Sequence, residues 1–183
     1  MRIEKLKERY QINVSFIPFP LHPETPEEGH SLETLFAGRN LDLPHMQSHM
    51  AELMQAEGLP YGDRTMTFNS RLAQELAKWV DTQIDDSNIH TLLFQAYFVE
   101  GINLSSIDNL VSIAGQAGMA PEEARNILIE RNFQNAVDSD WQRSLKLGIT
   151  SVTTFVINDQ GVAGAQPFEV LEQLVLAGGA TAR

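Results

Sequence analysis

Apolar and polar positions predict a strand near the start of the chain and a long helical stretch after it. Residues 11–17 alternate apolar and polar side chains as far as Phe16, which is the period of a β-strand, and two prolines then end the pattern. From residue 31 to residue 147 the apolar positions recur every three or four residues. This spacing is typical of helices that bury one face, so an all-helical region is expected there.

The last part of the chain returns to a strand pattern. Residues 152–157 are mostly β-branched or aromatic, residues 158–161 are turn formers, and residues 162–163 can return antiparallel. These features predict a hairpin in which Phe155 and Ile157 are buried. A helix is expected after Pro167, closed by a glycine pair.

The first residues predict a helix that has already begun. Ile3, Leu6 and Tyr10 fall on one helical face, yet no capping residue or entering loop precedes Ile3. We therefore expect the chain to start partway through a secondary-structure element.

A stripe of methionines marks one of the predicted helices. Met46, Met50 and Met54 recur at helical spacing with Leu53 beside them. We interpret the stripe as core packing, as for most apolar stripes. The alternative is an adaptable peptide groove, because methionine is common at surfaces that bind varied partners.

Composition indicates an ordinary globular chain and excludes several kinds of partner. The 183 residues are 43% hydrophobic and 20% charged, with 24 acidic against 13 basic side chains and a net charge of −11. Such a charge repels phosphate backbones, so nucleic acid is not expected as a partner. No apolar run is long enough to span a bilayer, and residues 1–10 lack the apolar core of a secretory signal, so we expect no membrane partner and a cytoplasmic location.

The chain has no cysteine, which removes thiolate nucleophiles, disulfides and cysteine metal sites. His45 and His49 lie one helical turn apart with Asp42 and Glu52 nearby, but no further ligand supports zinc, and a surface pair is expected. Motifs for a nucleophile elbow or a phosphate-binding loop are absent as well. We therefore expect no metal, no cofactor and no catalytic residue.

Three stretches of sequence carry a specific resemblance. Residues 16–24 read FIPFPLHPE, and residues 148–156 read GITSVTTFV before GAQP at 164–167. Residues 69–79, NSRLAQELAKW, add a third stretch. Together they resemble the FrnE-like branch of the DsbA family.

The resemblance implies an α/β, thioredoxin-like fold of the DsbA type with a large all-helical insertion. It assigns residues 1–30 and 148–183 to the thioredoxin-like domain and residues 31–147 to the inserted helical domain. The first strand of the fold is missing from this chain. Residues 11–17 and the hairpin are therefore expected to lose a common neighbour, which leaves open strand edges that invite aggregation or direct pairing.

The family's activity is that of a thiol-disulfide oxidoreductase or isomerase acting on protein or peptide thiol substrates, through a C-x-x-C and a cis-proline that faces it. The cysteine pair would lie upstream of Met1, and Thr153 stands at the cis-proline position. By this likeness Val152, Thr153 and Thr154 are the expected substrate-binding residues. We expect a trans peptide at Thr153, because a cis bond without proline costs about 2.5–4 kcal/mol.

Three functions remain open at this stage. The chain is a shortened thiol oxidoreductase of the FrnE type, a redox-inactive peptide-binding or chaperone-like module, or a relative of the glutathione-binding isomerases and transferases that share the fold. As written it is expected to be redox-inactive, because exchange needs sulfur.

Overall fold

The computed structural model describes residues 2–39 and 41–183. The chain forms two compact units, which are described separately. Unit 1 contains Met1–Leu21 and Asp140–Arg183, and unit 2 contains His22–Ser139.

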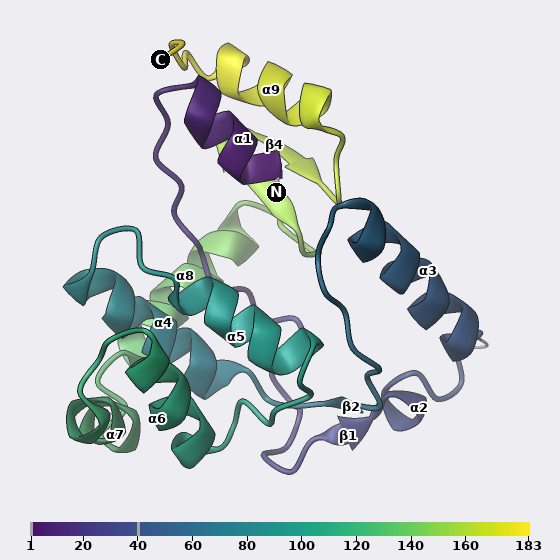
Figure 1. Cartoon of the computed structure of the whole chain (residues 1–183), viewed down its shortest axis with the longest axis vertical. Helices are drawn as coiled ribbons and strands as arrows, with labels where there is room; N and C mark the ends of the chain where they lie inside the picture. Colours follow the sequence, from purple (N-terminus) through teal and green to yellow (C-terminus); the bar gives the residue numbers. More distant parts are fainter. Residues whose placement is uncertain (1, 40) are drawn as a thin grey trace. The chain divides into compact units, whose positions relative to one another are not determined.

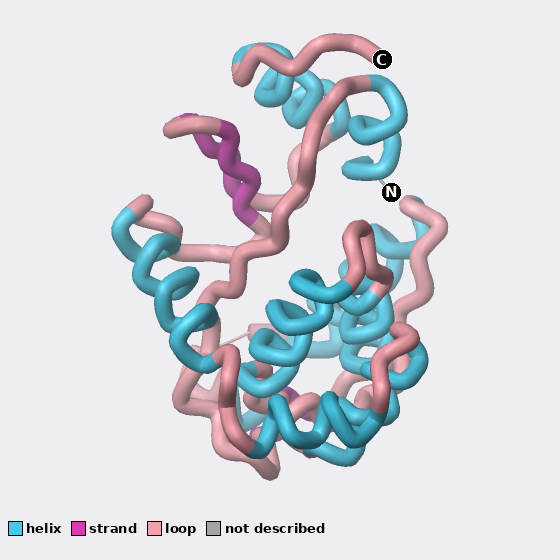
Figure 2. The backbone as a smooth tube through the Cα atoms, turned by 90° about the vertical axis from the view of Figure 1, so that its left-hand side faces the viewer, coloured by secondary structure: helices cyan, strands magenta, loops and turns pink. Residues whose placement is uncertain are grey.

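Unit 1 is built from a hairpin and helices taken from both ends of the chain (Figures 1 and 2). Its elements are α1 (Arg2–Arg9), the end of α8 (Gln134–Lys146), β3 (Thr154–Ile157), β4 (Gln160–Ala163) and α9 (Phe168–Ala177). The strands β3 and β4 pair antiparallel, with Thr154 opposite Ala163 and Ile157 opposite Gln160. The predicted hairpin and the predicted terminal helix are both present.

The core of unit 1 is small and lies where α1 and α9 meet the hairpin. Leu6, Leu171 and Val175 are buried, and Phe155 and Ile157 pack against them while only half-buried themselves. The prediction that these two strand residues are buried was therefore too strong, because a two-stranded hairpin has too little surface to enclose them. They are nevertheless the largest side chains of the hairpin that pack against this core.

The prediction of a strand at residues 11–17 is wrong. No strand occurs between residues 11 and 29, and Val14, Phe16 and Ile17 are 39%, 47% and 38% exposed. Near the start of the segment, Gln11 N–H donates to Thr181 O at 2.8 Å and Tyr10 forms an isolated bridge with Ala182. Alternation favours a strand only when a neighbouring strand accepts its hydrogen bonds, and none in the described part of the chain does so.

Unit 2 is helical apart from one short strand pair, β1 (His30–Ser31) and β2 (Met66–Thr67). Its helices are α2 (Leu32–Leu35), α3 (Leu43–Ala56), α4 (Arg71–Gln83), α5 (Ile89–Phe98), α6 (Ile107–Gln116), α7 (Pro121–Ile129) and the start of α8. Helices α4 to α7 pack around one apolar cluster in which Leu76, Trp79 and Leu110 are among the most buried side chains. None of the helices described is both long enough and apolar enough to cross a membrane.

The methionine stripe does not lie in the core, and the interpretation as core packing is wrong. Met46, Met50 and Leu53 are 42%, 43% and 46% exposed, and no residue of α3 is buried. Within unit 2, α3 stands apart from the helices that form the apolar cluster (Figure 1). The stripe has the right spacing for burial, but no other element of the unit covers it.

Candidate functional site

The predicted substrate-binding residues form the loop that leads into β3. Val152 is 53% exposed, Thr153 is exposed and Thr154, the first strand residue, is half-buried. All three lie in unit 1, at the end of β3 that follows the glycine-containing turn after α8. An exposed apolar side chain and two hydroxyl groups are therefore presented together.

The peptide bond between Val152 and Thr153 is cis. The expectation of a trans bond at Thr153 was wrong. It rested on the intrinsic preference of a non-proline peptide and took no account of the structure around the loop.

Hydrogen bonds hold both sides of this loop. Thr154 Oγ1 donates to Ser151 O at 2.8 Å, and Gly164 N–H donates to Thr153 O at 2.7 Å. The stretch after β4 is held by the Arg2 side chain, which donates to Ala165 O at 3.0 Å and to Gln166 O at 2.6 Å. Gly164 has a φ of 87°, a left-handed conformation that suits glycine.

The strand β3 has one open edge. Because Gly164 N–H bonds to Thr153 O, alternation along an antiparallel pair directs the peptide groups of Phe155 and Ile157 toward β4. The peptide groups of Thr154 and Val156 then point the other way, where no strand of the described residues meets them. This edge directly follows the exposed loop, and a further strand can join it.

An ion-pair network lies in unit 2, and sequence reasoning missed it. Glu75 is 1% exposed and accepts from Arg71 Nε at 2.7 Å and from Arg131 Nε and Nη2 at 2.8 and 2.7 Å. Arg71 Nη2 also donates to Asp138 Oδ1 at 2.7 Å, so that carboxylate is paired as well. The spacing of Arg71 and Glu75 by four residues was the available signal, but nothing in the sequence connects them to Arg131.

This network is structural and joins α4 to the turn between α7 and α8. The hydrogen bonds to Glu75 raise the pKa of the Arg131 guanidinium, although its partial burial acts in the opposite direction. In unit 1, the hydrogen bond from Tyr10 Oη to Glu172 similarly raises the pKa of Tyr10 above its usual value. Neither group lies beside the Val152–Thr154 loop in sequence.

Asn69, the first residue of the third stretch that carries the family resemblance, has a structural role as well. Its side-chain amide donates to Thr25 O at 2.6 Å and to Pro23 O at 3.3 Å, and its oxygen accepts from Arg71 N–H at 2.9 Å. Asn103 also donates to Glu27 O at 3.0 Å. The proline-containing segment at residues 23–27 is thus held to the rest of unit 2 by two asparagine side chains.

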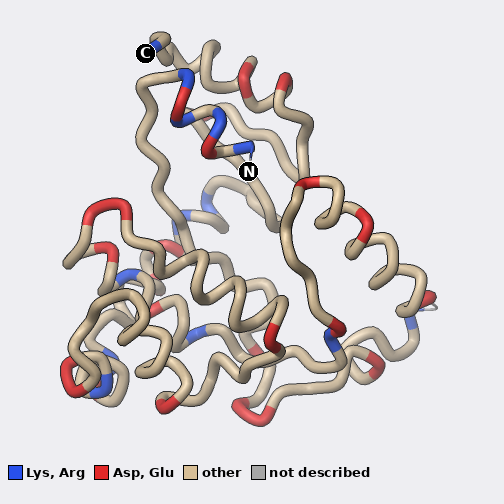
Figure 3. Tube along the Cα trace, viewed as in Figure 1, with Lys and Arg blue, Asp and Glu red and all other residues tan. Residues whose placement is uncertain are grey.

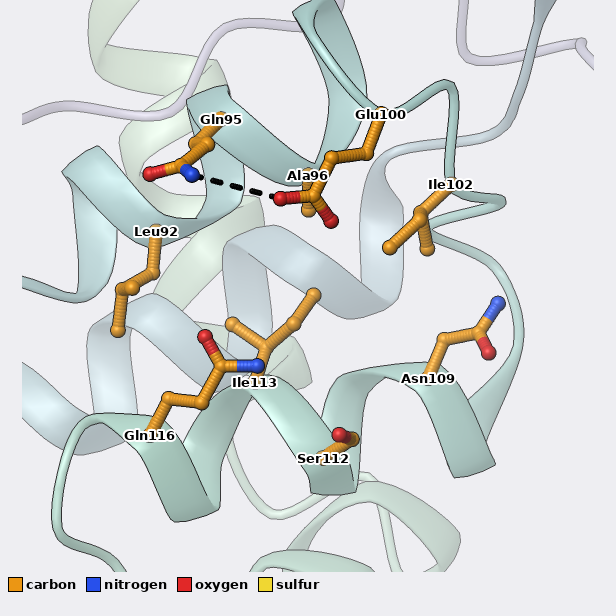
Figure 4. A pocket seen from close by; sticks show the side chains of 9 residues that line it. All are labelled: Leu92, Gln95, Ala96, Glu100, Ile102, Asn109, Ser112, Ile113 and Gln116. Atoms are coloured by element: carbon orange, nitrogen blue, oxygen red, sulfur yellow. Dashed lines mark hydrogen bonds between the residues drawn. The ribbon is translucent and has the colours of Figure 1, made fainter.

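A small cavity lies between α5 and α6 and is too small to be a substrate site. It measures about 80 Å³, well below the roughly 300–1,000 Å³ of sites for small organic ligands. Figure 4 shows its polar rim, where Gln95 donates to Glu100 at 3.4 Å, around a floor that includes Ile113. Its size suits a few water molecules.

The residues weighed as metal ligands are used differently. Asp42 caps α3 by accepting from His45 N–H at 3.0 Å, and His45 and His49 are both exposed on that helix. Across residues 2–39 and 41–183, no three histidine, aspartate or glutamate side chains gather closely enough to hold a metal ion. The capping role of Asp42 explains its position next to the histidines.

Comparison with known proteins supports the thioredoxin-like assignment. Residues 1–176 match the model of a family described as the DSBA-like thioredoxin domain. An uncharacterized protein, YwbO of Bacillus subtilis, is 30% identical over 87 residues, which is 47% of this chain and 44% of that relative. The match therefore spans less than half of that relative's length.

A solved structure is similar over most of the chain. It is described as a probable DsbA oxidoreductase from Streptomyces coelicolor, and it matches with a TM-score of 0.77 at 25% identity. The match covers 87% of this chain and 72% of the Streptomyces chain. The predicted α/β fold of the DsbA type with a helical insertion is confirmed, and the chain belongs to the family of DSBA-like thioredoxin domains.

Proposed function

We propose that these 183 residues form a DsbA-family module of the FrnE-like branch that binds extended peptide segments beside Val152, Thr153 and Thr154. The residues contain no thiol, so the module performs no thiol-disulfide exchange of its own. Its substrates are the class on which the family acts, protein and peptide chains in an extended conformation.

The observation that carries this proposal is the open edge of β3 together with the exposed loop before it. A peptide that adds as a strand beside Thr154 and Val156 exchanges hydrogen bonds with their backbone groups, and such bonds supply affinity without much dependence on sequence. Val152, at 53% exposure, offers an apolar contact to one side chain of that peptide. Peptide binding at this edge does not depend on disulfide exchange, because a strand can pair with β3 without a nucleophile.

The first test is binding of a short fluorescent peptide with alternating valine and serine, measured by anisotropy. Val152→Asp is expected to weaken binding at least tenfold, because a charge replaces the apolar contact at the rim of the site. Leu176→Asp is the matched control, since Leu176 is 50% exposed in α9 of the same unit. If both variants bind the peptide with the same affinity as the parent chain, the peptide does not bind at the proposed site.

The second test concerns the redox part of the proposal. Thr153→Pro restores the family's proline at this position, yet the variant is expected to reduce insulin disulfides no faster than buffer, as is the parent chain. A groove residue cannot replace a thiolate in disulfide exchange. Insulin turbidity above background for either protein contradicts the assignment.

A second candidate function is thiol-disulfide exchange by a longer protein that contains these residues. It is favoured by the Streptomyces structure, because the match covers 87% of this chain but only 72% of that longer chain. Such a protein would have to supply a C-x-x-C from outside residues 1–183. N-terminal mass spectrometry of the native protein, with a search for an in-frame C-x-x-C before the Met1 codon, distinguishes the two candidates.

A further inference from the structure

The exposed face of α3 is unexplained by peptide binding at β3, and it lies in the other unit. Met46, Met50 and Leu53 are spaced by four and three residues, so they lie along one side of the helix. Each is between 42% and 46% exposed. The helix has 14 residues and none of them is buried. An exposed apolar row of this kind is typical of a helix face that binds another protein.

The charged residues of α3 and of its two caps are all acidic, while Arg39 lies three residues before the amino-terminal cap. Between Arg39 and Arg64 the chain carries the acidic residues Asp42, Glu52, Glu57 and Asp63 and no lysine or arginine. Figure 3 shows acidic positions and no basic position along α3. Asp42 and Glu57 are the cap residues of the helix, so the apolar row runs between two exposed carboxylates.

The two ends of α3 differ in how strongly they attract a cation. The carboxyl end of a helix carries a partial negative charge, which reinforces Glu57 and attracts cations. At the amino end Asp42 already accepts from His45 N–H, and its second oxygen can still face a cation. A partner with basic groups at both ends of an apolar stripe therefore matches α3 along its length.

We propose that the α3 face, defined by Met46, Met50 and Leu53 between Asp42 and Glu57, binds a basic amphipathic helix. A second copy of this chain is disfavoured as the occupant, because each copy carries a net charge of −11 and the same carboxylates would meet. A basic partner gains from the same charges. Methionine side chains adapt to varied apolar surfaces, so the face selects charge and helical pattern more than a particular sequence.

The test uses a fluorescent synthetic helix of leucine and lysine with the leucines on one face, added to the full chain. Met50→Lys is expected to weaken its binding at least tenfold, because the substitution places a like charge in the apolar row. Ile129→Lys is the matched control, since Ile129 is 60% exposed on another helix of unit 2, and it is expected to leave the affinity within about twofold.

A second pair of variants tests the charge. Asp42→Asn with Glu57→Gln retains a capping side chain on α3 and removes both carboxylates, and the affinity is expected to fall at least threefold with a weaker dependence on salt. Circular dichroism of each variant establishes that α3 remains folded.

Several results would overturn the proposal. One is equal binding of a leucine–glutamate peptide of the same pattern, and another is equal binding of a lysine peptide whose leucines are scattered around the helix. A dimer in sedimentation equilibrium that Met50→Lys abolishes would assign the face to a second copy instead. The valine–serine peptide is neutral and probes unit 1. The proposal for α3 can therefore be wrong while the proposal for Val152 is correct, and the reverse.

Discussion

A chain that carries both Arg71→Met and Arg131→Met is expected to lose about 3–5 kcal/mol of unfolding free energy. Glu75 is 1% exposed, and these two guanidinium groups are its partners. Without them a carboxylate remains in an apolar surrounding with no cation beside it, which is among the most costly changes that a core can suffer. Urea unfolding followed by far-ultraviolet circular dichroism measures the loss as a lower midpoint.

The matched control adds Glu75→Leu to the double variant. This triple variant is expected to recover most of the lost stability, because a buried ion network replaced by apolar side chains of similar size is often nearly neutral. Arg131→Met alone is expected to cost less, since Arg71 still pairs with Glu75 and the Arg131 side chain is 39% exposed. A triple variant as unstable as the double variant would contradict the role given to Glu75.

Phe155→Ala is expected to destabilise unit 1 by about 3 kcal/mol, at the lower end of the range for deletion of a large aromatic side chain. Phe155 packs against the cluster formed by Leu6, Leu171 and Val175, but it is half-buried, so the neighbouring side chains relax more easily than in a closed core. The loss is large for a unit with so few buried residues. Thermal unfolding of the variant and the parent chain provides the measurement.

Val156→Ala is the control for this prediction. Val156 follows Phe155 in the same strand, but its side chain points to the opposite face and is 38% exposed. Its loss is expected to be below about 1 kcal/mol. Equal destabilisation by the two substitutions would show that β3 does not rest on the α1 and α9 core through Phe155.

Local patterns predicted the elements that carry their own signals. The hairpin follows from β-branched residues around a turn, and α9 follows from a proline before an apolar stripe whose Leu171 and Val175 are buried. The membership of the DsbA family also followed from short stretches of sequence. The domain boundaries placed after residues 30 and 147 stay a prediction.

Elements that depend on a partner were predicted less well. Residues 11–17 have the period of a strand, and the row from Met46 to Leu53 has the period of a buried helix face. Among the residues described, however, no strand pairs with residues 11–17 and no residue of α3 is buried. A period states which side chains share a face and does not state whether anything packs on that face. The same limit explains why the pairing of Glu75 with Arg131, 56 residues away in the chain, was missed.

The candidate site was located by resemblance and not by its own chemistry. Val152, Thr153 and Thr154 carry no unusual pattern, and the cis bond between the first two contradicts the expectation from peptide energetics. The open edge of β3 became evident only from the register of the hairpin, because the bond from Gly164 to Thr153 decides which backbone groups point outward. Sequence alone cannot supply that register when the turn is short and both strands are brief.

Amide hydrogen exchange of the full chain, with and without the neutral valine–serine peptide, tests the central claim most directly. The account predicts slower exchange at Thr154 and Val156, whose amides face the open edge, and unchanged exchange in β4 and in unit 2. At a peptide concentration near the Kd of the parent chain, the protection should be much weaker in Val152→Asp and persist in Leu176→Asp. Saturating peptide that leaves Thr154 and Val156 unprotected, or that protects only other segments, would contradict the claim that this family member binds extended chains at β3.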